Sequence, residues 1–290
     1  MKGTLDNIKN MEERFDLILI DGMNISYKFS WVHRDLTSKD GKETGLFFGV
    51  IRFIHYLKKK YKCKRIIILW DTKPKYKKSI SNDYKANRDH SDKKNFFKQV
   101  KELRYLLSLY NIDQAYSNGY EADDLACFFV KRELKTSKEI LLVSNDNDWF
   151  QLLLRKDIKI LKGNEIFNRE TIEEKYNLNI EKQCLFKAIT GDGKENVKGI
   201  PGIRKKLVWE LIENVDSIEE VIDKCYLEDN KWYSEIIKNK DTIIKNYKLK
   251  ELISEGYDIQ YIEKKNDFKK LLSILKKYNM NFLVRELGNE

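Results

Sequence analysis

Apolar runs that end in acidic residues are the feature of this sequence that most restricts its fold. The clearest is "LLVSNDNDW", residues 141–149, where an apolar run is followed by two acids separated by one amide. Two further apolar runs, at 15–21 and 65–71, end in Asp21 and Asp71. Because a charged group loses hydration energy on burial, such acids either simply reach the surface or await a cation. The pattern of the rest of the chain decides between these two explanations.

Short β-rich runs alternate with helical patterns over the first part of the chain. The runs are continuously apolar rather than alternating, which suits strands that are covered on both faces. Strand–helix alternation of this kind predicts a doubly wound, mostly parallel sheet of the α/β class. The expected strands lie at 15–21, 65–71, 112–117, 139–146 and 158–162, and the expected helices at 45–62, 93–111, 121–135 and 147–154.

Nine acids in five short motifs are the candidate metal ligands. They are Asp21 in "IDGMN", Asp71 in "LWDTK", Glu121, Asp123 and Asp124 in "YEADD", Asp146 and Asp148 in "SNDND", and Asp192 and Glu195 in "GDGKEN". One such motif alone is typical of a turn or a helix cap. Asp21, Asp71 and Asp146, however, follow strands whose carboxyl ends would meet at one sheet edge, where ligands of such sheets bind. Two divalent ions about 3.5–4 Å apart, held by such oxygens, can activate water for phosphoryl displacement.

The spacing within "YEADD" sets a geometric condition. On a regular helix Glu121 and Asp124 would share one face, while Asp123 would point elsewhere. All three can approach one metal site only if the motif straddles the start of the helix. Periodicity leaves open which of the three would be direct ligands.

Charge and cysteine content narrow the cellular setting and the class of partner. Lys and Arg total 56 against 46 for Asp and Glu, and this net charge of +10 favours nucleic acid as a partner. A Lys-rich composition accounts for part of that excess. The cysteines are scattered, with no CxxC pair, at Cys63, Cys127, Cys184 and Cys225. This fits the cytoplasm or another reducing intracellular compartment, and the source could be a bacterium, a phage or an organelle. We expect no membrane partner, because no signal-like or membrane-spanning apolar run is present.

The pattern changes from alternating strands and helices to mainly helical at about residue 165. We therefore expect an α/β region at 1–164 and a mainly helical region at 165–290 that packs on it, since no Gly/Ser/Pro-rich linker separates them. An extended segment at 257–263 would precede a last helix at 267–279. The stretch 72–95 is polar and basic, and an insertion of this length at the mouth of a sheet is typically functional or disordered.

In order, "IDGMN", "WDTK", "YKANR", "YEADD", "SNDND" and "GDGKENVKGIPGI" resemble the successive motifs of the flap endonuclease / 5′-nuclease family. The resemblance runs from about residue 15 to at least 225. It is closest to the stand-alone enzymes of bacteriophages and to the 5′-nuclease domain of bacterial DNA polymerase I. It implies a PIN-like, resolvase-like core with a helical arch at about 72–95 and a helix–hairpin–helix element at about 184–215. The implied activity is 5′→3′ exonuclease and structure-specific endonuclease cleavage near single-strand/duplex junctions, with two Mg²⁺ or Mn²⁺ ions.

The resemblance also implies roles for individual residues. The first metal ion would be held by Asp21, Asp71, Glu121, Asp123 and Asp124, and the second by Asp146, Asp148, Asp192 and Glu195. Lys85 and Arg88 in "YKANR", together with Lys28, match cations that stabilise charge on the scissile phosphate. Two positions depart from the family pattern: Glu195 replaces an Asp, and Arg204 replaces the second glycine of a "GIG" turn.

DNA contacts are expected from the arch and from the hairpin. The expected residues are Lys73, Lys75, Lys77 and Lys78 in the arch, and Lys198, Gly199, Gly202, Ile203, Lys205 and Lys206 in the hairpin. Tight glycine turns let backbone N–H groups approach phosphates without reading sequence, so binding should weaken with salt. The resemblance further implies a K⁺ ion in the hairpin. The expected partners are 5′ flaps or other branched or 5′-ended DNA, and RNA/DNA hybrids are equally compatible; we expect a monomer.

Two other functions are compatible with parts of the pattern. One is a PIN-like or RNase H-like ribonuclease with one effective metal ion, although a minimal PIN domain generally lacks the hairpin. The other is a catalytically silent DNA-binding relative. Retention of nearly every acid argues against the silent relative, because a binder gains nothing from negative charge that faces phosphate.

Overall fold

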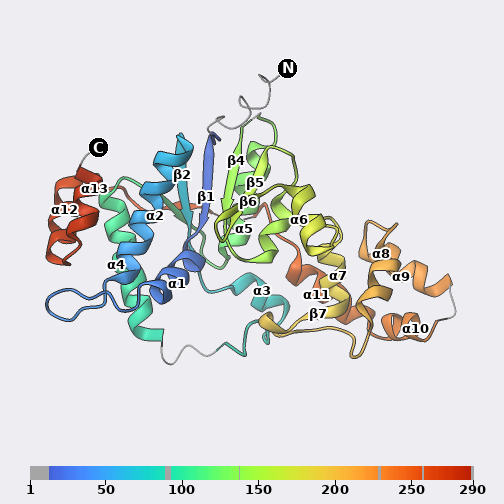
Figure 1. Ribbon diagram of the computed structural model, residues 1–290. Helices are drawn as coiled ribbons and strands as arrows, with labels where there is room; N and C mark the ends of the chain where they lie inside the picture. Colours follow the sequence, from blue (N-terminus) through green and yellow to red (C-terminus); the bar gives the residue numbers. More distant parts are fainter. Residues whose placement is uncertain (1–12, 89–92, 137, 228–229, 257, 289–290) are drawn as a thin grey trace, which may run out of the picture.

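A seven-stranded, mostly parallel sheet forms the centre of the protein. The structure is a computed structural model that describes residues 13–88, 93–136, 138–227, 230–256 and 258–288 (Figure 1). The strands run in the order β6-β5-β4-β1-β2-β3-β9. They are β1 (Leu17–Asp21), β2 (Arg65–Leu69), β3 (Asp113–Tyr116), β4 (Ile140–Val143), β5 (Ile158–Lys162), β6 (Glu165–Phe167) and β9 (Gln260–Tyr261). Within this seven-stranded sheet, the described strands pair antiparallel only at the two outer positions, β5 with β6 and β3 with β9. This confirms the predicted α/β class.

The register of β1 with its two neighbours positions the candidate acids. In parallel pairing, Asp21 lies opposite Leu69 of β2, and Ile20 lies opposite Val143 of β4. The carboxyl ends of the three strands therefore meet at one edge of the sheet. The residues that follow these strands emerge together, as the apolar runs predict.

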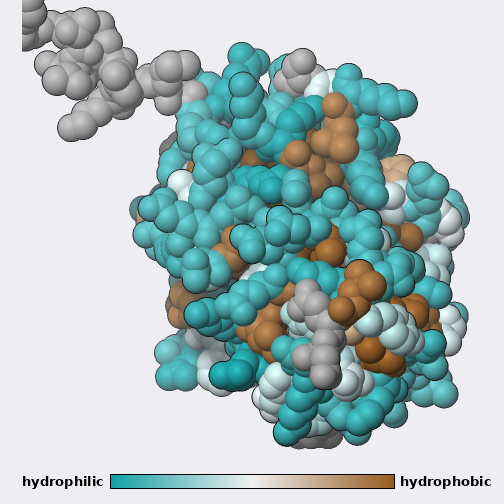
Figure 2. Space-filling model, turned by 90° about the vertical axis from the view of Figure 1, so that its right-hand side faces the viewer, coloured by the Kyte–Doolittle hydropathy of each residue, from teal (hydrophilic) through white to brown (hydrophobic). Residues whose placement is uncertain are grey.

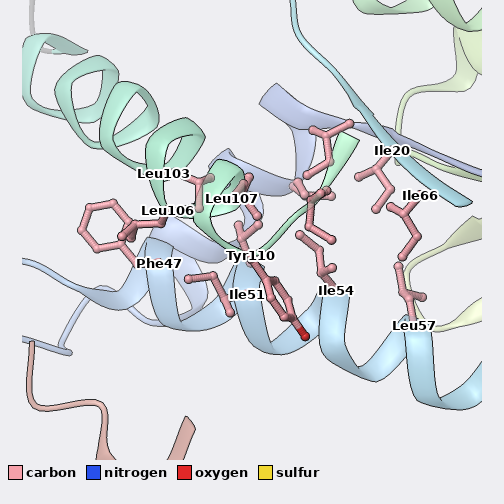
Figure 3. Packing of buried hydrophobic residues seen from close by; sticks show 14 of the residues in the cluster. Ile20, Phe47, Ile51, Ile54, Leu57, Ile66, Leu103, Leu106, Leu107 and Tyr110 are labelled. Carbon is pink, nitrogen blue, oxygen red and sulfur yellow. The ribbon is translucent and has the colours of Figure 1, made fainter. Parts of the chain in front are cut away.

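The continuous apolar character of β1 arises because both of its faces are buried. Ile18 and Ile20 contribute to one hydrophobic cluster, and Leu17 and Leu19 contribute to a second cluster on the opposite face. The first face is covered by α2 (Gly45–Tyr61) and α4 (Lys94–Leu109), and Figure 3 shows α2 side chains packed against this cluster. The second face is covered by α5 (Ala122–Glu133) and the 3₁₀ helix η3 (Asn147–Leu152). Each fully buried Leu or Ile contributes about 1.5–3 kcal/mol through removal from water.

A mainly helical region follows β6. Its helices are α6 (Arg169–Tyr176), α7 (Gln183–Thr190), α8 (Lys205–Ile212), α9 (Ile218–Leu227), α10 (Lys231–Lys238) and α11 (Lys240–Lys250). Helices α7 to α11 share a separate hydrophobic cluster that includes Ile189, Leu211 and Ile236. Between α7 and α8 lies a small hairpin of β7 (Gly191–Asp192), the 3₁₀ turn η4 (Gly193–Glu195) and β8 (Val197–Lys198).

The structure extends the sequence prediction in several places. Helices α1 (Gly22–Val32) and α13 (Asn281–Gly288) were not expected, and the segment predicted as a helix at 147–154 is the 3₁₀ helix η3. Two short strands lie beyond residue 164 in the mainly helical region, because β6 and β9 join the main sheet. β9 lies within the extended segment expected at 257–263, of which residue 257 is outside the described residues.

The last two helices belong to the core of the first region. Leu271 and Leu275 of α12 (Phe268–Lys277) and Leu283 of α13 pack in the same cluster as α2 and α4 (Figure 1). The boundary at 164/165 stays a prediction, and it falls between two paired strands, β5 and β6. Among the described residues, no helix is long and apolar enough to cross a membrane.

Candidate metal centre

Asp21, Asp71 and Asp146 lie at the sheet edge in different surroundings. Asp21 ends β1 and caps α1: its Oδ1 accepts a 2.9 Å hydrogen bond from the Asn24 backbone N–H, and Ser144 Oγ donates to its Oδ2 at 3.0 Å. Burial, with the charge of Asp71 added, raises the pKa of Asp21 to about 8. Asp71 Oδ1 accepts from the Ala122 backbone N–H at 2.7 Å, which ties it to the start of α5. Asp146 is exposed and caps η3.

The "YEADD" motif straddles the start of α5, which meets the geometric condition set by the sequence. Glu121 is the N-cap, and it forms a capping box with Asp124. The carboxylates of Glu121, Asp123 and Asp124 converge on one ammonium, Lys77 Nζ, at 3.2, 3.6 and 3.6 Å. We call these three acids the first cluster.

Lys77 has a position that the sequence did not indicate. It was expected on the DNA-binding surface of the arch, but only 4% of its side chain is exposed. Although burial opposes the change, the charges of Asp123, Asp124 and Glu121 raise the pKa of Lys77 well above its usual value. Its ammonium therefore acts as a counter-ion for the first cluster.

Asp148, Asp192 and Glu195 form a second cluster. Each offers a carboxylate oxygen, and these oxygens lie within 4.8 Å of one another. Asp148 comes from η3, whereas Asp192 and Glu195 come from the hairpin, so the helical region supplies part of the site. The longer Glu195 side chain reaches the cluster and is buried there. Two lysines contact these acids: Lys250 contacts all three, and Lys187 contacts Asp148 and Asp192.

Tyr84 and Lys85 join the two clusters. Tyr84 Oη lies 2.8 Å from Glu121 Oε2 and 3.0 Å from Glu195 Oε1. Lys85 Nζ contacts Glu121 and lies 3.1 Å from Glu195 Oε1. The Lys85 backbone has a left-handed φ of 55°, and its N–H donates to the Glu195 carbonyl at 2.8 Å. Asn87 Nδ2 donates to the Gly193 carbonyl at 3.0 Å. The basic segment is thus held against the hairpin, and sequence reasoning missed Tyr84 because a buried tyrosine has no local signal.

The basic segment 72–95 is only partly helical in the described residues. It contains α3 (Lys75–Ile80) and then turns through 82–87 before α4, and residues 89–92 lie outside the described residues. Arg88 is exposed. It lies close enough to Tyr27 for its positive charge to oppose the rise in pKa that burial causes in that tyrosine. Lys28 is directed elsewhere, with its Nζ 3.5 Å from the Gly163 carbonyl oxygen, and burial lowers its pKa.

The donor set fits hard divalent cations. Mg²⁺ and Mn²⁺ prefer carboxylate oxygens, and the described clusters consist of such oxygens. The convergence of each cluster on a lysine ammonium shows that its oxygens point towards a common cation position. The residues present can therefore hold divalent cations.

The expected DNA-binding residues, apart from Lys77, lie on or near the surface. Lys73, Lys75, Lys78, Lys198, Lys205 and Lys206 are exposed, and Ile203 is half-buried. Figure 2 shows the face on the side of α8, α9 and α10 as mostly hydrophilic, with hydrophobic residues in separate patches.

The loop between β8 and α8 needs glycine at two positions. At Gly199 a Cβ would lie 2.1 Å from the Thr190 carbonyl carbon, and Gly202 has a left-handed φ of 74°. Arg204 instead has an ordinary φ of −78° as the N-cap of α8. Its replacement of a family glycine therefore introduces no backbone strain.

Comparisons with known proteins support the resemblance seen in the sequence. Residues 16–177 match the family described as 5′-3′ exonuclease, N-terminal resolvase-like domain. The 5′-3′ exonuclease of Buchnera aphidicola subsp. Acyrthosiphon pisum is 31% identical over 281 residues, which covers 94% of this chain and 95% of the relative. DNA polymerase I of Bacillus subtilis is 25% identical, but this chain spans only 33% of its length. The structure of T5 5′-exonuclease with bound zinc ions matches with a TM-score of 0.69 at 19% identity, over 94% of this chain and 97% of that one, which shows a common fold.

Proposed function

The chain belongs to the 5′-3′ exonuclease family, and we propose that it is a structure-specific 5′-nuclease that cleaves DNA near single-strand/duplex junctions. The observation that carries this proposal is the convergence of the two carboxylate clusters beneath the basic segment. Carboxylates alone would repel the phosphates of a nucleic acid. Carboxylates that hold cations beside a basic segment can instead bind a phosphodiester and support its cleavage.

We assign the first divalent ion to the first cluster together with Asp71 and Asp21, and the second ion to the second cluster together with Asp146. Either Mg²⁺ or Mn²⁺ suits these oxygens. When bound there, such ions supply activation of water and stabilisation of the leaving oxygen.

The chain's own cations position and stabilise the phosphate in this proposal. Lys85 Nζ lies between the clusters, and Arg88 is exposed beside it, so both can face a phosphodiester at the sheet edge. Lys28 would have to leave its contact with Gly163 to take part. The exposed lysines of α8, Lys205 and Lys206, would grip the duplex through its phosphates. A K⁺ ion in the hairpin and a monomeric state remain predictions.

The test is cleavage of a 5′-labelled flap duplex in Mg²⁺, in Mn²⁺ and in EDTA, with the variant Asp148→Asn. We expect cutting near the junction that requires the metal and is lost in the variant, because Asp148 is buried in the second cluster. Asp113→Asn is the matched control, because Asp113 begins β3 at the opposite edge and pairs with Arg65. The control should cut normally.

Three results would change the proposal. Binding without cutting in either metal would favour the silent DNA-binding relative. Faster cleavage of an RNA/DNA hybrid or of RNA than of the flap would favour a ribonuclease. Cutting by Asp148→Asn at the wild-type rate would refute the assignment of the second cluster.

A further inference from the structure

Lys250 places a positive charge among all the carboxylates of the second cluster. Its Nζ lies 2.7 Å from Asp148 Oδ2 and 3.1 Å from Asp192 Oδ2, and it contacts Glu195 Oε2. Only 1% of the Lys250 side chain is exposed. An ammonium has three N–H donors and no acceptor, so three carboxylates satisfy it completely. The cluster and this lysine therefore form a closed ionic group.

A divalent ion would use the same oxygen atoms that Lys250 now occupies. Three carboxylates this close repel one another, and burial makes an uncompensated charge costly, so the cluster needs a cation at all times. We propose that Lys250 is the built-in counter-ion of the second cluster and that a divalent ion binds there only in exchange for its ammonium. This inference rests on the proposed metal-dependent function of the same site.

The first cluster has a looser counter-ion. Lys77 Nζ lies 3.2 Å from Glu121 Oε2, but its distances of 3.6 Å to Asp123 Oδ2 and to Asp124 Oδ2 are longer than a hydrogen bond. Lys77 comes from α3, a short helix in the basic segment that packs against α11, whereas Lys250 is the last residue of α11 itself, which packs mainly against α7. The ammonium of the second cluster is therefore held more firmly, and the second cluster should take up its ion more weakly than the first.

The end of α11 also connects Lys250 with the first cluster. The backbone N–H of Ile253 donates to Asp124 Oδ1 at 3.3 Å, and Gln151 Nε2 donates to the Lys250 carbonyl at 3.4 Å. These backbone contacts fix where the Lys250 side chain starts. Exchange therefore requires the side chain itself to swing out of the cluster rather than the helix to move.

The experiment is a calorimetric titration of the protein with Mn²⁺ alone, in the absence of DNA. Wild type should show one stronger and one weaker binding phase. Lys250→Met should tighten the weaker phase by at least about tenfold, because the competing charge is gone. In EDTA this variant should melt below wild type, and saturating Mn²⁺ should reduce the difference. Lys250→Arg, which keeps the charge, should retain the weaker phase.

The matched control is Lys182→Met. Lys182 is also a buried lysine, but its Nζ pairs with Asp216 and the Val215 carbonyl, away from both clusters. It should lose stability equally with and without Mn²⁺ and should leave both binding phases unchanged. If Lys250→Met binds the second Mn²⁺ no more tightly than wild type, or more weakly, the proposal is refuted.

Two further arms keep the test decisive. If Lys250→Met does not fold, Lys250→Gln replaces it, because the amide keeps hydrogen-bond donors among the three acids and removes the charge. It should also tighten the weaker phase, and no tightening refutes the proposal. Because the readout is ion binding, tightened binding in a protein that cuts no flap would refute the proposed function and leave this inference standing.

Discussion

The hydroxyl of Tyr84 should stabilise the metal-free protein by about the free energy of one charge-assisted hydrogen bond. Its Oη lies 2.8 Å from Glu121 and 3.0 Å from Glu195, yet a phenol has a single proton and can donate to only one carboxylate at a time. Burial and the surrounding negative charge raise the pKa of Tyr84 far above its usual range, so the hydroxyl keeps that proton. Hydrogen bonds to charged groups contribute about 1.5–3 kcal/mol.

The variant Tyr84→Phe removes the hydroxyl and keeps the ring in its pocket. The ring packs with Ile80, Val197 and Leu249, so no cavity forms. The free energy of unfolding should therefore fall by about 1.5–3 kcal/mol in EDTA. It should fall less in saturating Mg²⁺, where the carboxylates have cations. Urea unfolding followed by circular dichroism measures both values.

The control for this variant is Tyr226→Phe, since Tyr226 lies on α9 and is 59% exposed. Its effect should stay within about 0.5 kcal/mol, as for most surface substitutions. If Tyr84→Phe also changes stability by less than about 0.5 kcal/mol in EDTA, the hydroxyl does not join the clusters and the reasoning is refuted.

Two further predictions concern catalysis and pH. Lys85→Ala should slow single-turnover cleavage much more than it weakens DNA binding measured by fluorescence anisotropy, because Lys85 faces the clusters. Lys205 is exposed, so Lys205→Ala should weaken binding without slowing cleavage at saturating DNA. Equal losses of cleavage and binding in both variants would contradict the role assigned to Lys85. Burial raises the pKa of Asp21 to about 8 in the folded, metal-free protein, against 3.8 for an ordinary exposed Asp. Its contribution to stability in EDTA is therefore fully present below about pH 4 and is lost as pH rises towards 8. Asp21→Asn should flatten this decline in melting temperature, and a variant that melts with the wild-type pH profile would show that Asp21 is not the group responsible.

The sheet and its acidic edge were predictable because their causes are local in sequence. The apolar runs of β1, β2 and β4 specify strands that are buried on both faces, and parallel pairing brings their carboxyl ends together without further information. The acids that follow them, Asp21 and Asp71, lie where this rule places them. Helix α1 was missed because its buried positions, such as Ile25 and Phe29, are mixed with polar ones.

The second cluster and its lysines were harder to predict because they depend on packing between distant segments. Asp148 and Glu195 were candidates from motif order alone, and their contact requires the hairpin to dock on η3. Lys250 stands in "KLKEL", a sequence typical of a solvated helix end, and nothing local separates it from an exposed lysine such as Lys248. Only the docking of α11 shows that one of these lysines is buried.

The position of the lysines also changes what the net charge of +10 means for DNA binding. Four lysines face carboxylates inside the candidate centre: Lys77, Lys85, Lys187 and Lys250. In the metal-free protein their charge neutralises these acids and does not attract phosphate. Divalent ions bound in the clusters would neutralise the carboxylates instead, and the ammonium groups of these lysines would no longer be paired with them. Metal loading should therefore increase the positive potential at the sheet edge twice, once through the ions and once through the freed ammonium groups, where the exposed Lys78 already contributes. DNA affinity should accordingly rise with divalent ion concentration at constant ionic strength. If the lysines acted only at the surface, no rise would be expected, because screening depends on ionic strength and that is held constant.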